Sequence, residues 1–349
     1  MVAAAPMSTL LLIASSASDA SAKTPGKLQG RTIMFKSNSL HSVERFVRAS
    51  PKVNGTKPDM HADLSGLGKT VQDGMIFCQN FNVRSYETGA DGNASIETLM
   101  NYFQETALCH VKTVGLLGDG FGSTPEMYKR NLIWVVTKMQ VIVDRYPTWD
   151  DVVQVDTWVA ASGKNGMRRD WVVRDSNTGV TLTRASSQWV MLHKETRKLA
   201  KMPDEVREEI GGYFVDSPPV VDEDSRKLSE LTDDNADNVR TGLTPRWSDL
   251  DLNQHVNNVK YVGWILECVP LPILETRELA GITLEYRREC MMDSVVRSLT
   301  SVVSNGVGDL ASSGKVECQH LLQLQTGPVI VKGRTDWRPK KSNSEVSKI

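Results

Sequence analysis

The sequence predicts an α+β fold made of two similar halves, each with a long helix wrapped by an antiparallel sheet. Two observations support this prediction. An amphipathic helix is followed by several strands, and the same order of elements then occurs a second time along the chain. The 349 residues, of which 40% are apolar, are sufficient for a core in each half.

The first half begins with a helical pattern. Apolar side chains recur at i, i+3, i+4, i+7 and i+11 and so share one helix face: Ile96, Leu99, Met100, Phe103 and Ala107. This spacing predicts a helix from about 94 to 114. Runs rich in β-branched and aromatic residues then predict strands at 132–143, 152–159, 168–174 and 180–192.

The second half repeats this order from about residue 243. Apolar residues at helical spacing predict another helix, closed by Pro270 and Pro272, with this buried face: Val256, Val259, Val262, Leu266 and Val269. Strand patterns come next, at roughly 281–288, 294–304, 315–325 and 328–337.

The segment between the halves is acidic. Residues 203–240 hold 12 acidic and 4 basic residues, together with Gly211-Gly212 and Pro218-Pro219. We therefore expect a first domain over 58–202, an acidic, solvated linker over 203–242, a second domain over 243–340 and a flexible tail at 341–349.

The N-terminal segment differs in composition from the rest of the chain. Up to about residue 45 it is rich in Ala and Ser, and Asp19 is the only acidic residue before Glu44. This composition predicts a plastid transit peptide and flexible segment over 1–57. A secretory signal is the main alternative, because a short apolar run at 10–14 precedes Ala20-Ser21-Ala22, but no basic residue precedes that run. A merely disordered tail is the third.

Charge and cysteine content exclude several classes of protein. A net charge of −1, from 41 basic and 42 acidic residues, argues against a nucleic-acid-binding protein. The five cysteines lack a CxxC pair, which argues against a disulfide framework or a zinc site and favours a reducing compartment. No stretch approaches the roughly 18 to 20 apolar residues that span a bilayer.

Alignment of the two halves places reactive side chains in the second. The segment 91–95 has the pattern D-x-N-x-S, and 251–255, an offset of 160 residues (251 minus 91), has D-x-N-x-H. Residues 146–153 align in the same way with 289–296. The second half therefore has His255, Glu289 and Cys290 where the first has Ser95, Tyr146 and Pro147.

These residues supply the groups that thioester hydrolysis needs. His255 is the natural base, because an imidazole changes charge near neutral pH. Asp251 would hold one nitrogen of that ring, and Asn253 would donate a hydrogen bond to a polarised carbonyl. Glu289 or Cys290, expected on the strand after the helix, would respectively activate water or attack directly.

Each of these residues also has a purely structural interpretation. D-x-N-x-H before a helix is a pattern that caps helix N-termini. Cys290 on its own is more often a small buried apolar residue, and Glu289 next to Arg287 and Arg288 is more often half of a surface ion pair. The duplication favours catalysis, because a cap would work equally well with the serine of the first half.

Long motifs make the chain resemble a known family, the plant acyl-acyl carrier protein thioesterases, and more closely their B class, which is associated with saturated acyl chains. The resemblance covers about 58–340 and includes RSYE at 84–87, ASIETLMN at 94–101, LIWVV at 132–136, FVDSP at 214–218, NQHV at 253–256, GWILE at 263–267, LEYRREC at 284–290 and DWRPK at 336–340. It implies a tandem double hotdog fold, no cofactor or metal, and hydrolysis of fatty acyl-carrier thioesters in the plastid stroma. It is also compatible with a homodimer.

By motif match, the family's catalytic positions are Asp251, Asn253, His255, Glu289 and Cys290. Two mechanisms fit them: a triad of Cys, His and Asn, and a water-activating network of Asp, Asn, His and Glu. We favour water, because hotdog thioesterases in general hydrolyse without a cysteine. One departure is that residues 31–56 are too polar to form the apolar segment that B-class members carry before KPDM at 57–60, so membrane attachment is not expected.

The resemblance also gives the first half a function. We expect an acyl tunnel along the first helix and the segment near Met127, lined by Ile96, Met100, Phe103 and Met127, with ordinary core packing as the alternative. Because acyl carrier protein is strongly acidic, we expect it to dock on the densest basic cluster, Lys194, Arg197, Lys198 and Lys201. A solvated turn would have the same composition.

Two other functions are compatible with the sequence. One is a hotdog protein that binds acyl chains or an acyl carrier without cleaving them, and the other is a hotdog dehydratase that uses a His and a carboxylate. Release of free thiol from an acyl carrier substrate separates thioester hydrolysis from both. The preferred chain length and the transit-peptide cleavage site cannot be read from this sequence.

Overall fold

The computed structural model describes residues 68–118, 122–226, 228, 230–303 and 314–340. The described residues belong to one compact unit within Asp59–Ile349. The predicted transit peptide and N-terminal segment (1–57), the first residues of the predicted first domain (58–67) and the predicted tail (341–349) lie outside the described residues.

The first half contains the predicted helix and all four predicted strands. Its helices are α1 (Ile96–Thr113) and α2 (Pro125–Lys129), with a short 3₁₀ helix at Ser85–Glu87. Its strands are β1 (Lys69–Val71), β2 (Ile76–Asn82), β3 (Leu132–Val143), β4 (Val152–Ser162), β5 (Gly166–Asp175), β6 (Thr181–His193) and β7 (Leu199–Ala200). The Ser95 hydroxyl caps α1 by accepting a hydrogen bond from the Thr98 amide at 3.0 Å.

The second half contains the other four predicted strands and a shorter helix than predicted. Its elements are β8 (Asn238–Leu243), a 3₁₀ helix at Trp247–Asp249, α4 (Lys260–Leu266), α5 (Leu271–Thr276), β9 (Arg277–Tyr286), β10 (Val296–Val303), β11 (Val316–Leu324) and β12 (Val329–Pro339). Val256 and Val259 are buried as predicted, but both precede the first residue of α4. The buried residues at helical spacing therefore begin in the segment before the helix.

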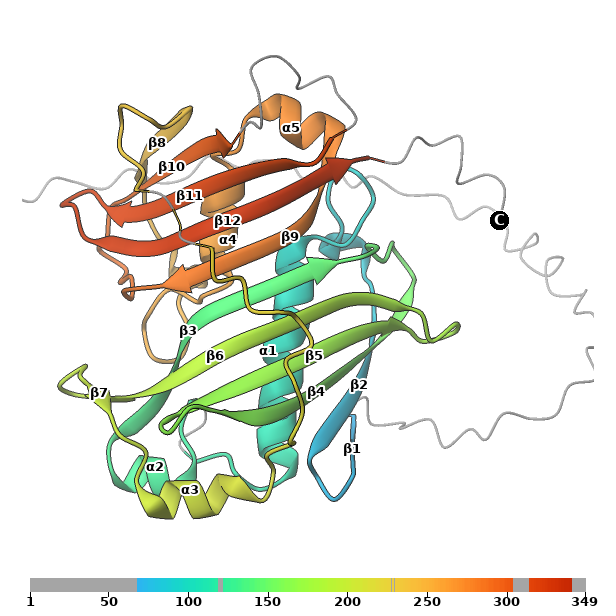
Figure 1. The fold of residues 1–349 in the computed structure, drawn as a ribbon, viewed down its shortest axis with the longest axis vertical. Coiled ribbons are helices and arrows are strands. Elements are labelled where there is room, and N and C mark those ends of the chain that lie inside the picture. The colour runs from blue at the N-terminus through green and yellow to red at the C-terminus, as the bar shows by residue number, and fades with distance from the viewer. Residues whose placement is uncertain (1–67, 119–121, 227, 229, 304–313, 341–349) are drawn as a thin grey trace, which may run out of the picture. The chain divides into compact units, whose positions relative to one another are not determined.

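One antiparallel sheet runs through both halves, in the order β1-β2-β4-β5-β6-β3-β9-β12-β11-β10-β8 (Figure 1). The halves meet where β3 pairs with β9, in a register from Lys138↔Glu285 to Ile142↔Gly281. Helices α1 and α4 lie on the same face of this sheet (Figure 1). Their apolar faces share one core, in which Leu99 and Phe103 from α1 join Val262 and Ile265 from α4.

The linker between the halves crosses the opposite face of the sheet (Figure 1). It begins with α3 (Asp204–Gly211) and then meets the strands in their order in the sheet. Its contacts, from β4 to β3, are Val215 with Val159, Ser217 with Arg168, Val221 with Ser186 and Asp222 with Gln140. Many side chains of the linker are exposed, but its backbone hydrogen-bonds to the sheet and Val221 is buried, so the linker is attached to the sheet over this part.

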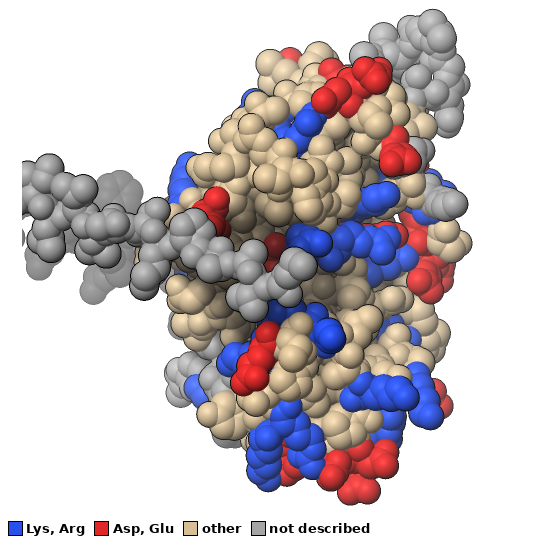
Figure 2. All heavy atoms as spheres, turned by 90° about the vertical axis from the view of Figure 1, so that its left-hand side faces the viewer, with Lys and Arg blue, Asp and Glu red and all other residues tan. Residues whose placement is uncertain are grey.

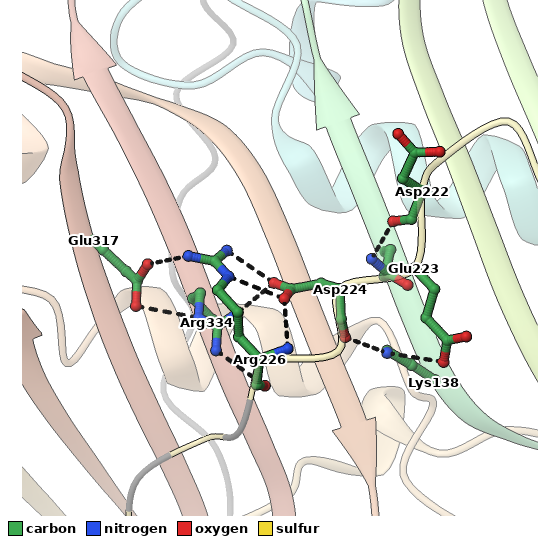
Figure 3. Close-up of polar contacts among 8 residues, drawn as sticks. Lys138, Asp222, Glu223, Asp224, Arg226, Glu317 and Arg334 are labelled. Carbon is green, nitrogen blue, oxygen red and sulfur yellow. Dashed lines mark hydrogen bonds and ion pairs between the residues drawn. The ribbon is translucent and has the colours of Figure 1, made fainter.

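The acidic residues of the linker bind basic side chains on both halves (Figure 3). Lys138 on β3 donates to the Asp224 carbonyl oxygen at 2.7 Å. The Asp224 carboxylate pairs with Arg334 on β12, which is 2% exposed and also lies 3.2 Å from Glu317 on β11. Arg226 bridges Asp224 and Glu317. Some of the acidic residues that give the linker its negative charge therefore form structural ion pairs.

The carboxyl group of Asp224 is held in its charged form. Partial burial alone would raise its pKa, but hydrogen bonds from Arg226 and the charge of Arg334 outweigh burial and hold the pKa well below its ordinary value. Because folding lowers this pKa, the ion pairs stabilise the fold above the pKa of an unfolded Asp, about 3.9. That contribution is lost as the pH falls below this value.

Removing the Asp224 charge should therefore destabilise the fold in a pH-dependent way. We expect Asp224→Asn to lower the free energy of unfolding by about 1.5–3 kcal/mol at neutral pH, because Arg334 loses a charged partner at a buried position. Urea unfolding followed by tryptophan fluorescence measures this difference, which should shrink below about pH 4.

The matched control is Glu223→Gln on the same linker, where the side chain is 61% exposed. Its effect should stay within about 0.5 kcal/mol. Equal losses in the two variants, or a loss from Asp224→Asn that does not change with pH, would contradict the structural role of this ion pair.

Candidate active site

The segment Asp251–His255 forms a tight loop whose shape Asp251 fixes. The Asp251 amide donates to the His255 carbonyl at 2.7 Å, and the Gln254 amide donates to the Asp251 carbonyl at 3.0 Å. The Asp251 carboxylate accepts from the Asn253 amide at 2.8 Å and from the His255 amide at 3.1 Å. Gln254 has φ +64°. These bonds account for the acid at the first position of D-x-N-x-H, because a short carboxylate side chain closes the turn on itself.

A matching loop occurs in the first half. There the Asp91 carboxylate accepts from the Asn93 amide at 3.1 Å. A 3₁₀ helix precedes each loop, and in each an acidic side chain accepts from the backbone amide of an arginine three residues earlier: Glu87 from Arg84 and Asp249 from Arg246, both at 2.8 Å. This R-x-x-[E/D] repeat was missed by sequence alignment, although it was readable in the sequence at an offset of 162 residues (246 minus 84).

The two loops lead into their helices differently. Ser95 is the N-cap of α1, whereas α4 begins only at Lys260, with Val259 as its N-cap and no side chain capping it. Helix capping is therefore correct for the first loop and wrong for the second. The His255 side chain has no capping function and is half-buried.

The His255 ring faces Glu289. Its Nε2 atom lies 3.6 Å from Oε2 of Glu289, a contact that side-chain movement or one water molecule would complete. The expectation that Asp251 holds this ring is corrected by the structure, since the Asp251 carboxylate binds two backbone amides of its own loop. Asn253 lies on the same loop, and its role as a hydrogen-bond donor to a substrate stays a prediction.

Glu289 and Cys290 lie in a loop after β9, which ends at Tyr286, and not on a strand as expected. The backbone of Cys290 fixes this loop beside the histidine loop. Its amide donates to the Tyr261 hydroxyl at 3.2 Å, and its carbonyl accepts from the Val256 amide at 2.9 Å. These two bonds explain why Glu289 stands beside His255.

Cys290 itself is packed into the core. Its side chain is fully buried, and its Sγ atom lies 3.8 Å from the Met291 carbonyl oxygen. Burial raises the pKa of this thiol, so its unreactive protonated form is favoured further at neutral pH. The structure thus brings Glu289 to His255 and gives Cys290 the environment of a structural cysteine.

The predicted basic cluster lies around the hairpin that joins β6 to β7. Lys194, Lys198 and Lys201 are exposed, but Arg197 is half-buried and its guanidinium pairs with Glu289 of the other half. Figure 2 shows the side of the molecule on which β7 lies, where Lys and Arg gather across the centre and lower part of the surface.

An apolar cavity lies between the C-terminal half of α1 and the first part of the sheet. Its apolar lining includes Ala107, Val111, Leu116, Trp134, Val159, Met167, Ile210 and Phe214. Arg169 and His110 contribute polar groups to it and lie 3.3 Å apart. Burial, followed by the charge of Arg169, lowers the pKa of His110 to about 4, so that this imidazole is neutral at neutral pH.

The residues predicted to line an acyl tunnel lie elsewhere. Met100 and Phe103 are buried in the core shared by both halves, and Met127 belongs to a small cluster with Leu132 and Met191. Ile96 borders a second cavity next to the first-half loop. An acyl tunnel lined by these residues therefore stays a prediction. The cavity lies near the C-terminal end of the same helix, where neither His110 nor Arg169 of β5 had a sequence signal.

The part of the chain that the structure describes contains no group of three or more His, Cys, Asp or Glu side chains arranged to hold a metal ion. No helix in that part has both the length and the apolar character needed to cross a membrane.

Known proteins resemble the chain over most of its described length. The model of the acyl-ACP thioesterase N-terminal domain matches residues 74–210, and that of the acyl-ACP thioesterase C-terminal domain matches residues 232–339. A palmitoyl-acyl carrier protein thioesterase, chloroplastic, of Arabidopsis thaliana is 67% identical over 284 residues, covering 81% of this chain and 69% of that protein. A dodecanoyl-[acyl-carrier-protein] hydrolase, chloroplastic, of Umbellularia californica is 53% identical over 271 residues, covering 78% of this chain and 70% of that protein.

Solved structures resemble the fold. The 12:0-ACP thioesterase from Umbellularia californica is similar with a TM-score of 0.72 and 52% identity, covering 77% of this chain and 95% of that one. An acyl-ACP thioesterase from Bacteroides thetaiotaomicron has a TM-score of 0.61 at 21% identity, covering 77% and 100% of the two chains. At that identity the likeness concerns the fold alone, which is the tandem double hotdog.

The burial of Cys290 leads to a prediction about its reactivity. In the folded protein at neutral pH, we expect Cys290 to react with iodoacetamide at least about tenfold more slowly than an exposed thiol, because the thiolate is scarce and shielded. Peptide mass spectrometry at timed intervals measures this rate. Unfolding in urea should abolish the protection, and fast alkylation of Cys290 in the folded protein would contradict the assignment of a structural cysteine.

Proposed function

Because the chain belongs to the acyl-ACP thioesterase family, it is a thioester hydrolase acting on fatty acyl groups of acyl carrier protein, and we propose that His255 and Glu289 activate the attacking water. The contact between Nε2 of His255 and Oε2 of Glu289 carries this proposal. A histidine and a carboxylate that face each other in a half-buried site are groups that take up and return protons.

The proposed reaction begins with a water held between the two side chains. This water loses a proton to the pair, and its oxygen attacks the thioester carbonyl carbon. The carbon–sulfur bond breaks, a free fatty acid forms, and the carrier sulfur leaves as a thiol by taking the proton back from the pair. Asn253 is the proposed donor to the carbonyl oxygen while it carries negative charge.

The apolar cavity of the first half is the proposed site for the acyl chain. Arg197, which pairs with Glu289, follows β6, and Trp189 of β6 lines the cavity. A chain bound there would thus start near the proposed water and extend toward α1. We propose saturated chains as substrates, in keeping with the palmitoyl and dodecanoyl names of the relatives.

The carrier and the compartment complete the proposal. We propose that the acidic carrier docks on the exposed side chains of Lys194, Lys198 and Lys201, together with Arg287 and Arg288 next to Glu289. The relatives are named chloroplastic, which supports plastid localisation, and we propose the stroma as the compartment. A homodimer stays a prediction.

The water mechanism predicts which side chains are essential. His255→Ala and Glu289→Gln should each lower turnover of an acyl-carrier substrate by about 10² or more, the scale of losing an acid–base group. Cys290→Ala and Ser95→Ala should retain most activity, because the Cys290 thiol is buried and Ser95 caps helix α1. Release of free thiol measures turnover.

Loss of activity in Cys290→Ala but not in Glu289→Gln would contradict the water mechanism and show that Cys290 is the nucleophile. Mass spectrometry of rapidly quenched protein gives an independent test, since attack by Cys290 would leave an acyl group on its peptide. We expect no such adduct. An adduct that forms as fast as turnover would exclude water as the first nucleophile.

The cavity leads to a prediction about chain length. Ala107→Leu should fill part of the cavity and shift the released fatty acids toward shorter chains, because a longer chain no longer fits. Gas chromatography of products from a mixture of acyl carriers measures the shift. Ile273→Val, in the core of the second half, is the control and should leave the product profile unchanged. An unchanged profile in Ala107→Leu, with the protein folded, would count against this cavity.

A further inference from the structure

Glu289 has a second partner besides His255, and this partner comes from the other half of the molecule. Arg197 binds Oε1 of Glu289, while Oε2 of the same carboxylate faces His255. Each oxygen of the carboxylate therefore has a different neighbour. A carboxylate held at one oxygen by a guanidinium cannot rotate freely about its last bond, so the second oxygen keeps its direction.

Arg197 differs in burial from the other basic residues of its hairpin. Arg287, two residues before Glu289, pairs with Glu285. Lys194 and Lys198, on the same hairpin as Arg197, are exposed. Arg197 alone among the four cluster residues is half-buried. The expected surface pair between Glu289 and its sequence neighbours is therefore replaced by a contact between the two halves.

The backbone at Arg197 gives a second, independent observation. Arg197 has φ +54°, in the left-handed region that favours glycine. Its amide donates to the His193 carbonyl at 2.9 Å, and the His193 amide donates to the Lys198 carbonyl at 2.9 Å, so the hairpin requires this conformation. Glycine would suit the turn at least as well as arginine does, so the turn itself does not require the arginine side chain.

The strand order brings the Arg197 hairpin and the Glu289 loop to the same end of β3. Strands β6 and β9 pair with opposite edges of β3 and both run antiparallel to it, so both end near the start of β3. The hairpin that carries Arg197 follows β6, and the loop that carries Glu289 follows β9. The joining of β3 to β9 thus brings together one residue from each half.

We infer that Arg197 is a positioning residue of the active site, which fixes the Glu289 carboxylate so that its free oxygen faces His255 and the attacking water. Arg197 is accordingly removed from the docking cluster and assigned to the chemical step. This inference rests on the proposed role of Glu289. It also means that the second half, which carries the reactive groups, depends on the first half for their alignment.

Three variants test this role. Arg197→Gly removes the side chain and suits the turn, so the thermal midpoint should stay equal or rise, while kcat falls about 10-fold to 100-fold and KM changes less than about threefold. Arg197→Lys should recover part of kcat, because it keeps a charge near Oε1. Thr196→Ala, the exposed neighbour on the hairpin, should leave kcat unchanged.

Combining Arg197→Gly with Glu289→Gln separates the inference from the proposed function. If Arg197 acts through Glu289, the double variant should be no slower than Glu289→Gln alone. A normal kcat in Arg197→Gly, with Glu289→Gln inactive, would overturn the inference and leave the function intact. Substantial activity in Glu289→Gln would instead refute the proposed role of Glu289. A rise in KM alone would show that Arg197 belongs to docking, which overturns the inference.

Discussion

The pairing of β3 with β9 is the constraint on which the rest of the structure depends. Each half alone would end its sheet in an unpaired edge, and pairing these two edges converts two sheets into one. The same pairing places α1 and α4 on one face, so that Phe103 and Val262 belong to a single core. Because an antiparallel register fixes position along both strands, it also fixes which loops of one half face the other.

The linker secures this junction from the opposite face. It crosses the strands in their order, and its acidic residues meet basic side chains from both halves, Lys138 from the first and Arg334 from the second. A nearly buried guanidinium needs charged partners, and Asp224 and Glu317 supply them. The core and the linker therefore hold the same junction through different interactions, apolar packing on one face and ion pairs on the other.

The duplication gives the two halves a similar loop, which has a different role in each half. In the first half the loop leads directly into α1, and Ser95 is used as its cap. In the second half the helix starts later, so His255 is free of any capping bond and turns toward Glu289. The first half contributes instead the apolar cavity and Arg197. The different roles of His255 and Ser95 thus result from a small local difference, the number of residues between the loop and the next helix.

The sequence by itself determined the local structure and the candidate catalytic residues. Helical spacing predicted α1, residue type predicted eight strands, and the repeat comparison singled out His255, Glu289 and Cys290. The sequence did not predict the late start of α4 or the contacts of the linker, and it left both a buried and a catalytic Cys290 open. Only the tertiary structure decided that Arg197 binds Glu289, 92 residues away in sequence. Periodicity reports which side of an element is buried, whereas a contact between distant residues depends on the register in which whole strands meet.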